Sequence, residues 1–278
     1  MMRFYTMASE SRSVDFRRFC RFFFAFNPER RLYVIPFEED CPLITEMIAQ
    51  DARISLVATD PRIDDVGMRV YSDETYRENV PSWRYFRKFN AFCGHRDPFL
   101  FLDANSLVLS GWNEEWYFPK MDVQSVYFRG PSKIDRTIPV GHVSQFLSDL
   151  GLNSASGYNM GGFISHGGVF DPAIALALAQ PRLRKVLRRA PEQGFMACYM
   201  AVFGIGNGLM TALEPRIRLK HRGESLRYHE GTTCWSEASG HVLALTKYTG
   251  ANYTPHSEMI EDILAQRLKD GGRKDEDP

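Results

Sequence analysis

The chain has 278 residues, of which 44% are hydrophobic and 24% charged, so it is long enough to bury a substantial core as a single domain. Its 34 lysines and arginines balance its 34 aspartates and glutamates, which argues against the strongly basic surface of a nucleic-acid-binding protein. No run approaches the roughly 20 apolar residues that a transmembrane helix needs. We therefore expect a globular protein with no nucleic-acid partner and no transmembrane segment.

The five cysteines are scattered along the chain and contain no Cys-x-x-Cys pair, so they do not predict a zinc or redox centre. Free cysteines are typical of the reducing cytoplasm. The first residues, MMRFYTMASESRSV, lack the apolar core of a signal peptide. We expect a cytoplasmic protein, and the sequence leaves homo-oligomerisation open.

Strands and helices alternate along the first hundred residues. The helices show apolar residues at helical spacing, and the strands are short runs that are mostly apolar. The predicted helices are 13–27, where Asp15 is placed to cap the helix, 41–52 and 82–94, and the predicted strands are 3–8, 31–37, 54–59 and one that begins at Phe99. Such alternation implies a mostly parallel central sheet flanked by helices on both faces.

The segment SWRYFRKFNAFCG, residues 82–94, leads into the strand that begins at Phe99. Trp83, Phe86, Phe89 and Cys93 share one face at α-helical spacing, and Gly94 is placed to end the helix. We therefore expect an amphipathic α-helix directly before this strand.

The second half of the chain is less regular. Strands are predicted over 124–130, 161–168, 216–222 and 240–248, and helices over 173–190 and 191–204. The turn-rich stretch GLNSASGYNMGG stands between two of these segments, where a binding loop could lie. The last residues, 266–278, are charged and nearly free of apolar side chains, which predicts a disordered tail.

Asp103 and Asn105 follow directly after the apolar run FLFL. Ligands of α/β sheets bind outside the carboxyl ends of the strands, and two oxygen-bearing side chains two residues apart suit a divalent cation and its phosphates. A simpler interpretation is that Asp103 caps the next turn while Asn105 forms an Asx-turn. The spacing alone favours the simpler interpretation, so further motifs are needed to decide.

Four stretches, taken in order, resemble the glycogenin-like glycosyltransferases of the GT-A fold. RKFNAFCGHRDPFLFLDANSLVL resembles the family's Asp-x-Asp segment with its preceding helix, and YNMGGFIS resembles the family's Phe-Asn-Ser-Gly strand. PEQGFMACYM resembles the Asp-Gln-x-x-Leu-Asn start of a helix, and HVLALTK resembles the C-terminal segment in which a lysine follows a histidine by six residues. Each motif is weak alone, and their shared order is the stronger signal.

The resemblance implies a GT-A-like α/β domain over residues 1–265, with a mostly parallel central sheet and a smaller acceptor-side β/α lobe. It implies transfer of a hexose or N-acetylhexosamine from a nucleotide-diphosphate donor, a UDP-sugar by resemblance, to an unknown acceptor. It also suggests that the anomeric configuration is retained, which the residues themselves do not decide.

By the same resemblance, Asp103, Asn105 and His241 would be ligands of Mn²⁺ or Mg²⁺, since oxygen and imidazole ligands suit Mn²⁺. Lys247 would contact the leaving diphosphate, and Lys88 would lie near the donor phosphates or sugar. The simpler interpretations are a strand histidine hydrogen-bonded at the sheet edge and two solvated lysines.

The first strand and two loops would complete the nucleotide-sugar site. Asn159 is suited to bind a sugar hydroxyl, and two glycines that follow it would let the ligand approach the backbone closely. A tight turn entering a strand is the alternative explanation for those glycines. The predicted nucleotide-sugar contacts beyond the metal and phosphate ligands are Tyr5, Thr6, Ala8, Ala104, Asn159, Gly161 and Gly162.

Glu192 and Gln193 follow Pro191 at the start of a predicted helix. The resemblance places both at the catalytic centre, because the family has an aspartate that faces the sugar and acceptor where this chain has Glu192. The alternative is that the helix dipole alone favours an acid there. If the reaction inverts the configuration, Glu192 is the carboxylate that we would nominate as general base.

Two departures from the family pattern keep other functions open. Asn105 replaces the second acid of Asp-x-Asp, which should weaken cation affinity, and Tyr248 stands where the family has proline. A noncatalytic nucleotide-sugar or carbohydrate-binding protein with a degenerate metal site is therefore one alternative. A sugar nucleotidyltransferase is another, although the stretch ASESRSVDFRR after the first strand lacks the glycines of such an enzyme's phosphate loop.

Overall fold

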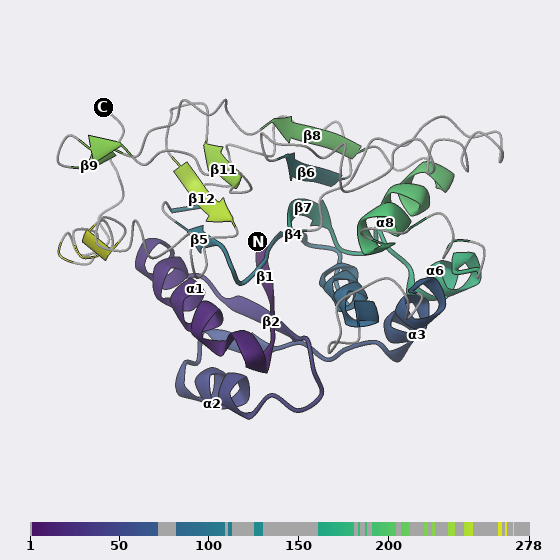
Figure 1. Ribbon diagram of the computed structural model, residues 1–278, viewed down its shortest axis with the longest axis horizontal. Coiled ribbons are helices and arrows are strands. Elements are labelled where there is room, and N and C mark those ends of the chain that lie inside the picture. Colours follow the sequence, from purple (N-terminus) through teal and green to yellow (C-terminus); the bar gives the residue numbers. More distant parts are fainter. Residues whose placement is uncertain are drawn as a thin grey trace.

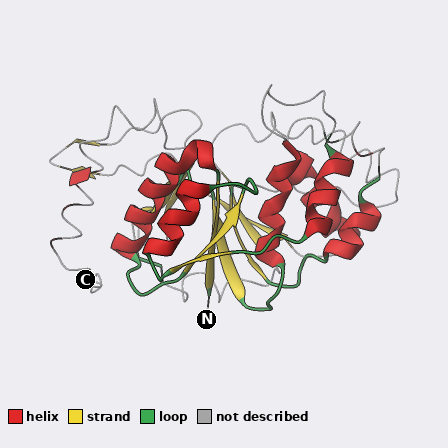
Figure 2. Ribbon diagram, turned by 90° about the horizontal axis from the view of Figure 1, so that it is seen from below, coloured by secondary structure: helices red, strands yellow, loops and turns green. Residues whose placement is uncertain are grey.

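The computed structural model describes residues 2–71, 82–108, 111–112, 125–129, 161–180, 183, 187, 191–203, 207–211, 220–221, 224–225, 233–236, 242–246, 261–262, 265 and 269. The strands among them form a seven-stranded sheet and two smaller sheets. Helices cover both faces of the large sheet (Figures 1 and 2), so the predicted α/β architecture is confirmed.

The seven-stranded sheet has the order β3-β2-β1-β4-β7-β6-β8. Its strands are β3 (Ile54–Leu56), β2 (Leu32–Pro36), β1 (Arg3–Ala8), β4 (Pro98–Leu102), β7 (Gly162–His166), β6 (Ser125–Arg129) and β8 (Asn207–Thr211). All neighbours pair in parallel except β7, which runs antiparallel to both β4 and β6. The sheet is thus mostly parallel, as predicted.

Two helical layers explain why β4 is apolar along its whole length. The helices α1 (Ser13–Phe26) and α2 (Pro42–Gln50) lie on one face of the sheet, and α3 (Pro61–Val70), η2 (Ser82–Phe92), α6 (Pro172–Leu178) and α8 (Pro191–Val202) lie on the other (Figure 2). Phe99 and Phe101 of β4 belong to the core under α3 and α8, whereas Leu100 and Leu102 belong to the core under α1. A strand with two buried faces needs apolar residues on both.

Helix α1 begins at Ser13 as predicted, but its N-cap residue is not the predicted one. A short 3₁₀ turn, η1 (Glu10–Arg12), runs directly into it, so that Arg12 is the N-cap residue and makes no side-chain capping bond. Asp15 lies within the first turn, 3.4 Å from Arg18. The prediction that Asp15 caps the helix is therefore wrong.

Residues 82–92 form a 3₁₀ helix rather than the expected α-helix. Its three residues per turn place Phe86, Phe89 and Phe92 in line, and all three are fully buried. Cys93 is off this line and only partly buried. The helix does end before Gly94, whose φ of 75° is the left-handed conformation that glycine adopts without strain.

The 3₁₀ geometry also separates the polar side chains of η2. Residues three apart eclipse one another in such a helix, so Arg84 lies in line with Arg87, and Tyr85 lies in line with Lys88. The Lys88 ammonium is indeed 5.8 Å from the centre of the Tyr85 ring. Arg87 and Lys88 are consequently aimed at different parts of the molecule although they are adjacent in sequence.

The second half of the chain contributes α6, α8, two strands of the large sheet and most strands of the smaller sheets. β5 (Leu107–Val108), β12 (Val242–Thr246) and β11 (Thr233–Ser236) form the three-stranded sheet, and β9 (Lys220–His221) pairs with β10 (Glu224–Ser225). Within the predicted tail 266–278, only Lys269 is described, and its backbone is helical. Among the described residues, no helix combines the length and apolar character that crossing a membrane requires.

Candidate functional site

The carboxyl ends of β1 and β4 meet the amino end of β7 at one edge of the sheet. β1 and β4 pair in parallel, and Leu102, the last residue of β4, pairs with Gly162. One residue further, the Asp103 N–H donates to the carbonyl oxygen of Gly161 at 3.0 Å. The structure therefore brings together Asp103 and the two glycines, which the sequence places in separate motifs.

A tight turn follows β4 and holds Asn105. The Ser106 N–H donates to the carbonyl oxygen of Asp103 at 3.0 Å. The Asn105 Oδ1 atom is buried and accepts no hydrogen bond within the described part of the chain, so the Asx-turn of the simpler interpretation is not formed. An unpaired buried acceptor costs about 1–3 kcal/mol, which makes this oxygen a candidate for contact with a ligand.

Lys88 and Asp103 form an enclosed ion pair at this edge. Lys88 Nζ lies 2.7 Å from Asp103 Oδ1, and the Lys88 side chain is 6% exposed, against 30% for Asp103. The ammonium also lies 5.6 Å from the centre of the Phe101 ring, where the face of the ring attracts a cation. The lysine that the sequence places near the donor site therefore contacts the residue predicted to hold the metal.

Glu192 approaches the same pair from the first turn of α8. Its side chain is buried, and the hydroxyl of Tyr71 donates to Glu192 Oε2 at 2.9 Å. Burial raises the pKa of Glu192, while the positive charge of Lys88 lowers it and the negative charge of Asp103 raises it further. Gln193 is the next residue and is half-buried. Glu192 therefore interacts electrostatically with both members of the Lys88–Asp103 ion pair.

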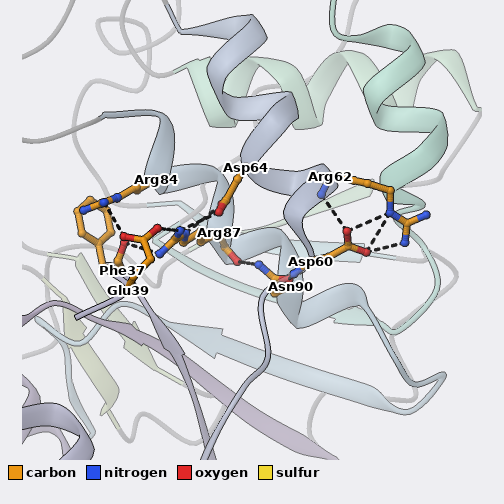
Figure 3. Close-up of polar contacts among 8 residues, drawn as sticks. All are labelled: Phe37, Glu39, Asp60, Arg62, Asp64, Arg84, Arg87 and Asn90. Atoms are coloured by element: carbon orange, nitrogen blue, oxygen red, sulfur yellow. Dashed lines mark hydrogen bonds and ion pairs between the residues drawn. The ribbon is translucent and has the colours of Figure 1, made fainter. Parts of the chain in front are cut away.

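Arg87 anchors η2 to α3 and to the loop after β2 (Figure 3). Its side chain is 3% exposed and binds Asp64 of α3 with two nitrogens, at 2.9 and 2.7 Å. It also donates to the carbonyl oxygen of Phe37 at 3.0 Å and contacts the Glu39 carboxylate. Arg84 reaches the same carboxylate at 2.6 Å, so two arginines join η2 to the loop after β2.

Asn90 makes a further connection between η2 and α3, also visible in Figure 3. Its Oδ1 accepts from the Asp60 N–H at 2.7 Å, and its Nδ2 donates to the carbonyl oxygen of Arg87 at 2.8 Å. Asp60 in turn caps α3 by accepting from the Arg62 N–H at 2.9 Å. The helix that carries Lys88 is therefore fixed to its surroundings by contacts that the sequence pattern did not indicate.

The residues predicted from the first strand lie deep in the sheet. Tyr5 is buried and stacks on Tyr33 and His95, at 5.2 and 5.7 Å between ring centres. Thr6 is fully buried, its Oγ1 has no hydrogen-bond partner in the described part of the chain, and Ala8 is also buried. A role for these three residues in binding a nucleotide stays a prediction.

Of the remaining predicted site residues, the structure describes one, Ala104. Ala104 packs against the core under α1, whereas Asn159, His241 and Lys247 lie outside the described residues. Strand β12 ends at Thr246, and its Leu245 pairs with Leu107 of β5. The carboxyl end of β12 therefore lies beside the turn that holds Asn105.

The oxygens of Asp103 and Asn105 fit a divalent cation. Mg²⁺ and similar hard cations prefer carboxylate and amide oxygens and complete their shell with water and substrate phosphates. The unpartnered Asn105 Oδ1 supplies one such oxygen, although Lys88 occupies one oxygen of Asp103. Among the described residues, no cluster of at least three His, Cys, Asp or Glu side chains could hold a metal by itself.

Comparisons with known proteins identify the fold but no sequence family. No family model matches the sequence, and no curated protein matches it. The galactosyltransferase LgtC with donor and acceptor sugar analogues is similar at a TM-score of 0.57 and 12% identity, covering 95% of this chain and 96% of LgtC. An LgtC active-site mutant with glutamate in place of glutamine gives 0.56 and 13%, with the same coverage. The predicted GT-A fold is therefore confirmed.

Proposed function

We propose that this chain is a retaining glycosyltransferase that moves a hexose or N-acetylhexosamine from a UDP-sugar, in a metal-dependent reaction, to an acceptor of unknown identity. The observation that carries the proposal is the enclosed Lys88–Asp103 pair beside Glu192. It lies at the edge of a GT-A sheet where ligands of such sheets bind. The match to a galactosyltransferase over 95% of the chain supports the same reaction class.

Lys88 is suited to interact with the donor's phosphates. Because its side chain is only 6% exposed, the charge of Lys88 is screened much less by water than that of a surface lysine. Lys247 is the residue after β12, and β12 ends beside the turn that holds Asn105. This position supports a role for Lys247 as a second positive charge at the diphosphate. Positive groups placed in advance lower the cost of the charge that develops on a leaving diphosphate.

Asp103 and Asn105, with His241 by resemblance, would hold the cation that the reaction uses. Mn²⁺ or Mg²⁺ bound there would neutralise charge on the diphosphate. The protein holds the side-chain oxygens of this turn at the end of β4, because the Asp103 backbone is hydrogen-bonded to Gly161 and Ser106. A metal at this site remains part of the proposal.

The sugar would lie toward Glu192, Gln193 and the loop that ends at Gly161. An active-site glutamine was mutated in the LgtC structure described above, and Gln193 is the glutamine in the motif that resembles the family's helix start. The half-buried side chain of Gln193 stands next to the buried Glu192. These placements support contacts with the transferred sugar and the acceptor.

The proposal is tested by incubating the protein with a panel of nucleotide sugars and Mn²⁺ and measuring donor turnover or hydrolysis. The wild type should consume one UDP-sugar, and Asp103→Ala should abolish that turnover. Asp97→Ala is the matched control, because Asp97 also pairs with a cation beside β4, Arg3 at 2.9 Å, but at the opposite end of the strand. Full turnover by Asp103→Ala would contradict the proposal.

A noncatalytic nucleotide-sugar-binding protein is the second candidate. Two observations favour it, since Asn105 carries no charge and Lys88 already neutralises Asp103. Such a protein would bind UDP or a UDP-sugar with an affinity that Mn²⁺ does not change, and it would turn over none of the donors. The same panel of nucleotide sugars therefore separates the two candidates.

A further inference from the structure

The ammonium of Lys88 lies between two aromatic rings. Lys88 Nζ is 5.8 Å from the centre of the Tyr85 ring, one turn earlier on η2, and 5.6 Å from the centre of the Phe101 ring on β4. Both distances are within the roughly 6 Å over which the face of a ring attracts a cation. Because the Lys88 side chain is only 6% exposed, water competes little with this attraction. Two rings and the Asp103 carboxylate thus act on the same ammonium.

Each of these rings is held by another ring on a different element. The Tyr85 ring meets Phe37, in the loop after β2, at 5.2 Å between ring centres and an interplanar angle of 60°. Phe101 stacks on Phe163 of β7 at 5.0 Å, and the two residues pair across β4 and β7. Phe37, Phe101 and Phe163 are all buried. The core therefore sets the positions of both rings, and the lysine does not.

A lysine needs support of this kind more than an arginine does. Its ammonium is a compact charge on a flexible stem of four carbons, without the rigid fork of a guanidinium. Asp103 fixes the ammonium only while its carboxylate is available. In the proposed function the same carboxylate also serves a divalent cation, which competes with the lysine for its oxygens and repels the ammonium. The rings take no part in that competition, so they can keep the ammonium in place.

We propose that Tyr85 is a positioning residue whose ring, together with that of Phe101, holds the Lys88 ammonium at the site independently of Asp103. Lys88 then stays beside the donor's phosphates when the Asp103 oxygens serve a cation. This inference rests on the proposed function for what Lys88 does there, because the phosphates belong to the nucleotide-sugar donor. The hold of the rings on the ammonium does not depend on that function.

NMR of the lysine side chains tests the inference without turnover, in protein made with carbon-13-labelled lysine. The face of an aromatic ring shifts nearby protons upfield, so the Hε protons of Lys88 should resonate upfield of those of surface lysines. Lys88→Met identifies the signal by its absence. Asp103→Ala should keep the upfield position, because both rings remain. Tyr85→Leu should move the signal toward the surface position, and Tyr85→Phe should leave it upfield.

Two NMR results would overturn the inference. If the signal moves to the surface position in Asp103→Ala, the carboxylate and not the rings holds the lysine, and Asp103→Asn gives the same test should the alanine variant not fold. If the signal is unchanged in Tyr85→Leu, the Tyr85 ring does not act on Lys88. Phe24→Leu is the matched control, because it takes a ring from Arg53, which lies 4.0 Å from the ring centre. Arg53 precedes β3 at the opposite edge of the sheet, so this control should not move the signal.

A double-mutant cycle in kcat tests the role of Tyr85 in the reaction. Tyr85→Leu should lower kcat by about tenfold with little change in KM, and Tyr85→Phe should recover most of that loss. Because Tyr85 acts through Lys88, Tyr85→Leu should cause no further loss in a Lys88→Met background. Wild-type kcat in Tyr85→Leu, or the same loss in the Lys88→Met background, would overturn the inference. If the wild type turns over no donor, the proposed function fails, and the NMR result still decides what holds Lys88.

Discussion

The two ends of β4 carry the same kind of ion pair in different surroundings. Before the strand, Asp97 pairs with Arg3 at 2.9 Å, with 45% and 32% of the side chains exposed. After the strand, Asp103 pairs with Lys88 at 2.7 Å, and only 6% of the lysine is exposed. An exposed pair contributes about 0–1 kcal/mol, so Arg3–Asp97 needs no functional explanation. The enclosed Lys88–Asp103 pair, which lies where the strands of the sheet end, does need an explanation of its own.

The same contrast occurs around η2, where Arg87 is enclosed and Arg62 is exposed. Both arginines bind an aspartate through two nitrogens, but Arg87 is 3% exposed, against 51% for Arg62. Burial of the arginine distinguishes the ion pairs that hold η2 in place from the ion pairs on the surface. Four measurements test this distinction.

Arg87→Met should have the largest effect on stability. It leaves the Asp64 carboxylate without its cation in a partly enclosed place, and breaking such a pair costs about 3–5 kcal/mol. Urea denaturation measures the change in the free energy of unfolding. Arg62→Met is the control and should change it far less, and equal losses would show that enclosure does not matter here.

Lys88→Met should lower turnover strongly, by about 100- to 1,000-fold in kcat, because it removes a positive charge placed in advance near the diphosphate. Arg3→Met, at the other end of β4, should leave kcat unchanged. Steady-state kinetics with the donor found in the nucleotide-sugar panel provide the measurement. If kcat is unchanged in Lys88→Met, the Lys88–Asp103 pair contributes to stability and not to catalysis.

Asn105→Asp should tighten Mn²⁺ binding, by about tenfold, because it adds a negative charge beside the cation. Asn105→Ala removes the oxygen and should weaken binding. Calorimetric titration of Mn²⁺ in the presence of UDP gives both values. If the two variants and the wild type bind Mn²⁺ equally, residue 105 is a turn residue and not a ligand.

The sequence predicts the elements better than the contacts between them. Strand β1 occupies residues 3–8 as expected, because its apolar pattern is unambiguous. Helix α3 was not predicted, although Asp60 at its N-cap and Pro61 in its first turn are typical signals of a helix start. The sequence predicts an α-helix where η2 is a 3₁₀ helix, because apolar residues three apart occur along one face of either helix. Cys93 fits the α-helical spacing after Phe89, whereas Phe92 fits the 3₁₀ spacing, and the structure buries Phe92.

In the candidate site, too, the sequence indicates single residues but not the contacts between them. Asp103 and Gly161 were picked out by local motifs, and the antiparallel pairing of β4 with β7 places the end of one strand beside the start of the other. The Tyr71–Glu192 contact joins residues 121 positions apart, and no local pattern announces it. Arg87 likewise looks like any helix arginine until the fold brings Asp64 against it. Partners of this kind emerge only from tertiary packing.

Calorimetric titration of UDP in the presence of Mn²⁺ tests the central claim most directly, namely that the enclosed Lys88–Asp103 edge is the donor site. The wild type and Asp97→Ala should bind UDP with the same Kd, and Asp103→Ala should show no measurable binding. If Asp103→Ala binds UDP as tightly as the wild type, the donor site lies elsewhere and the account is contradicted.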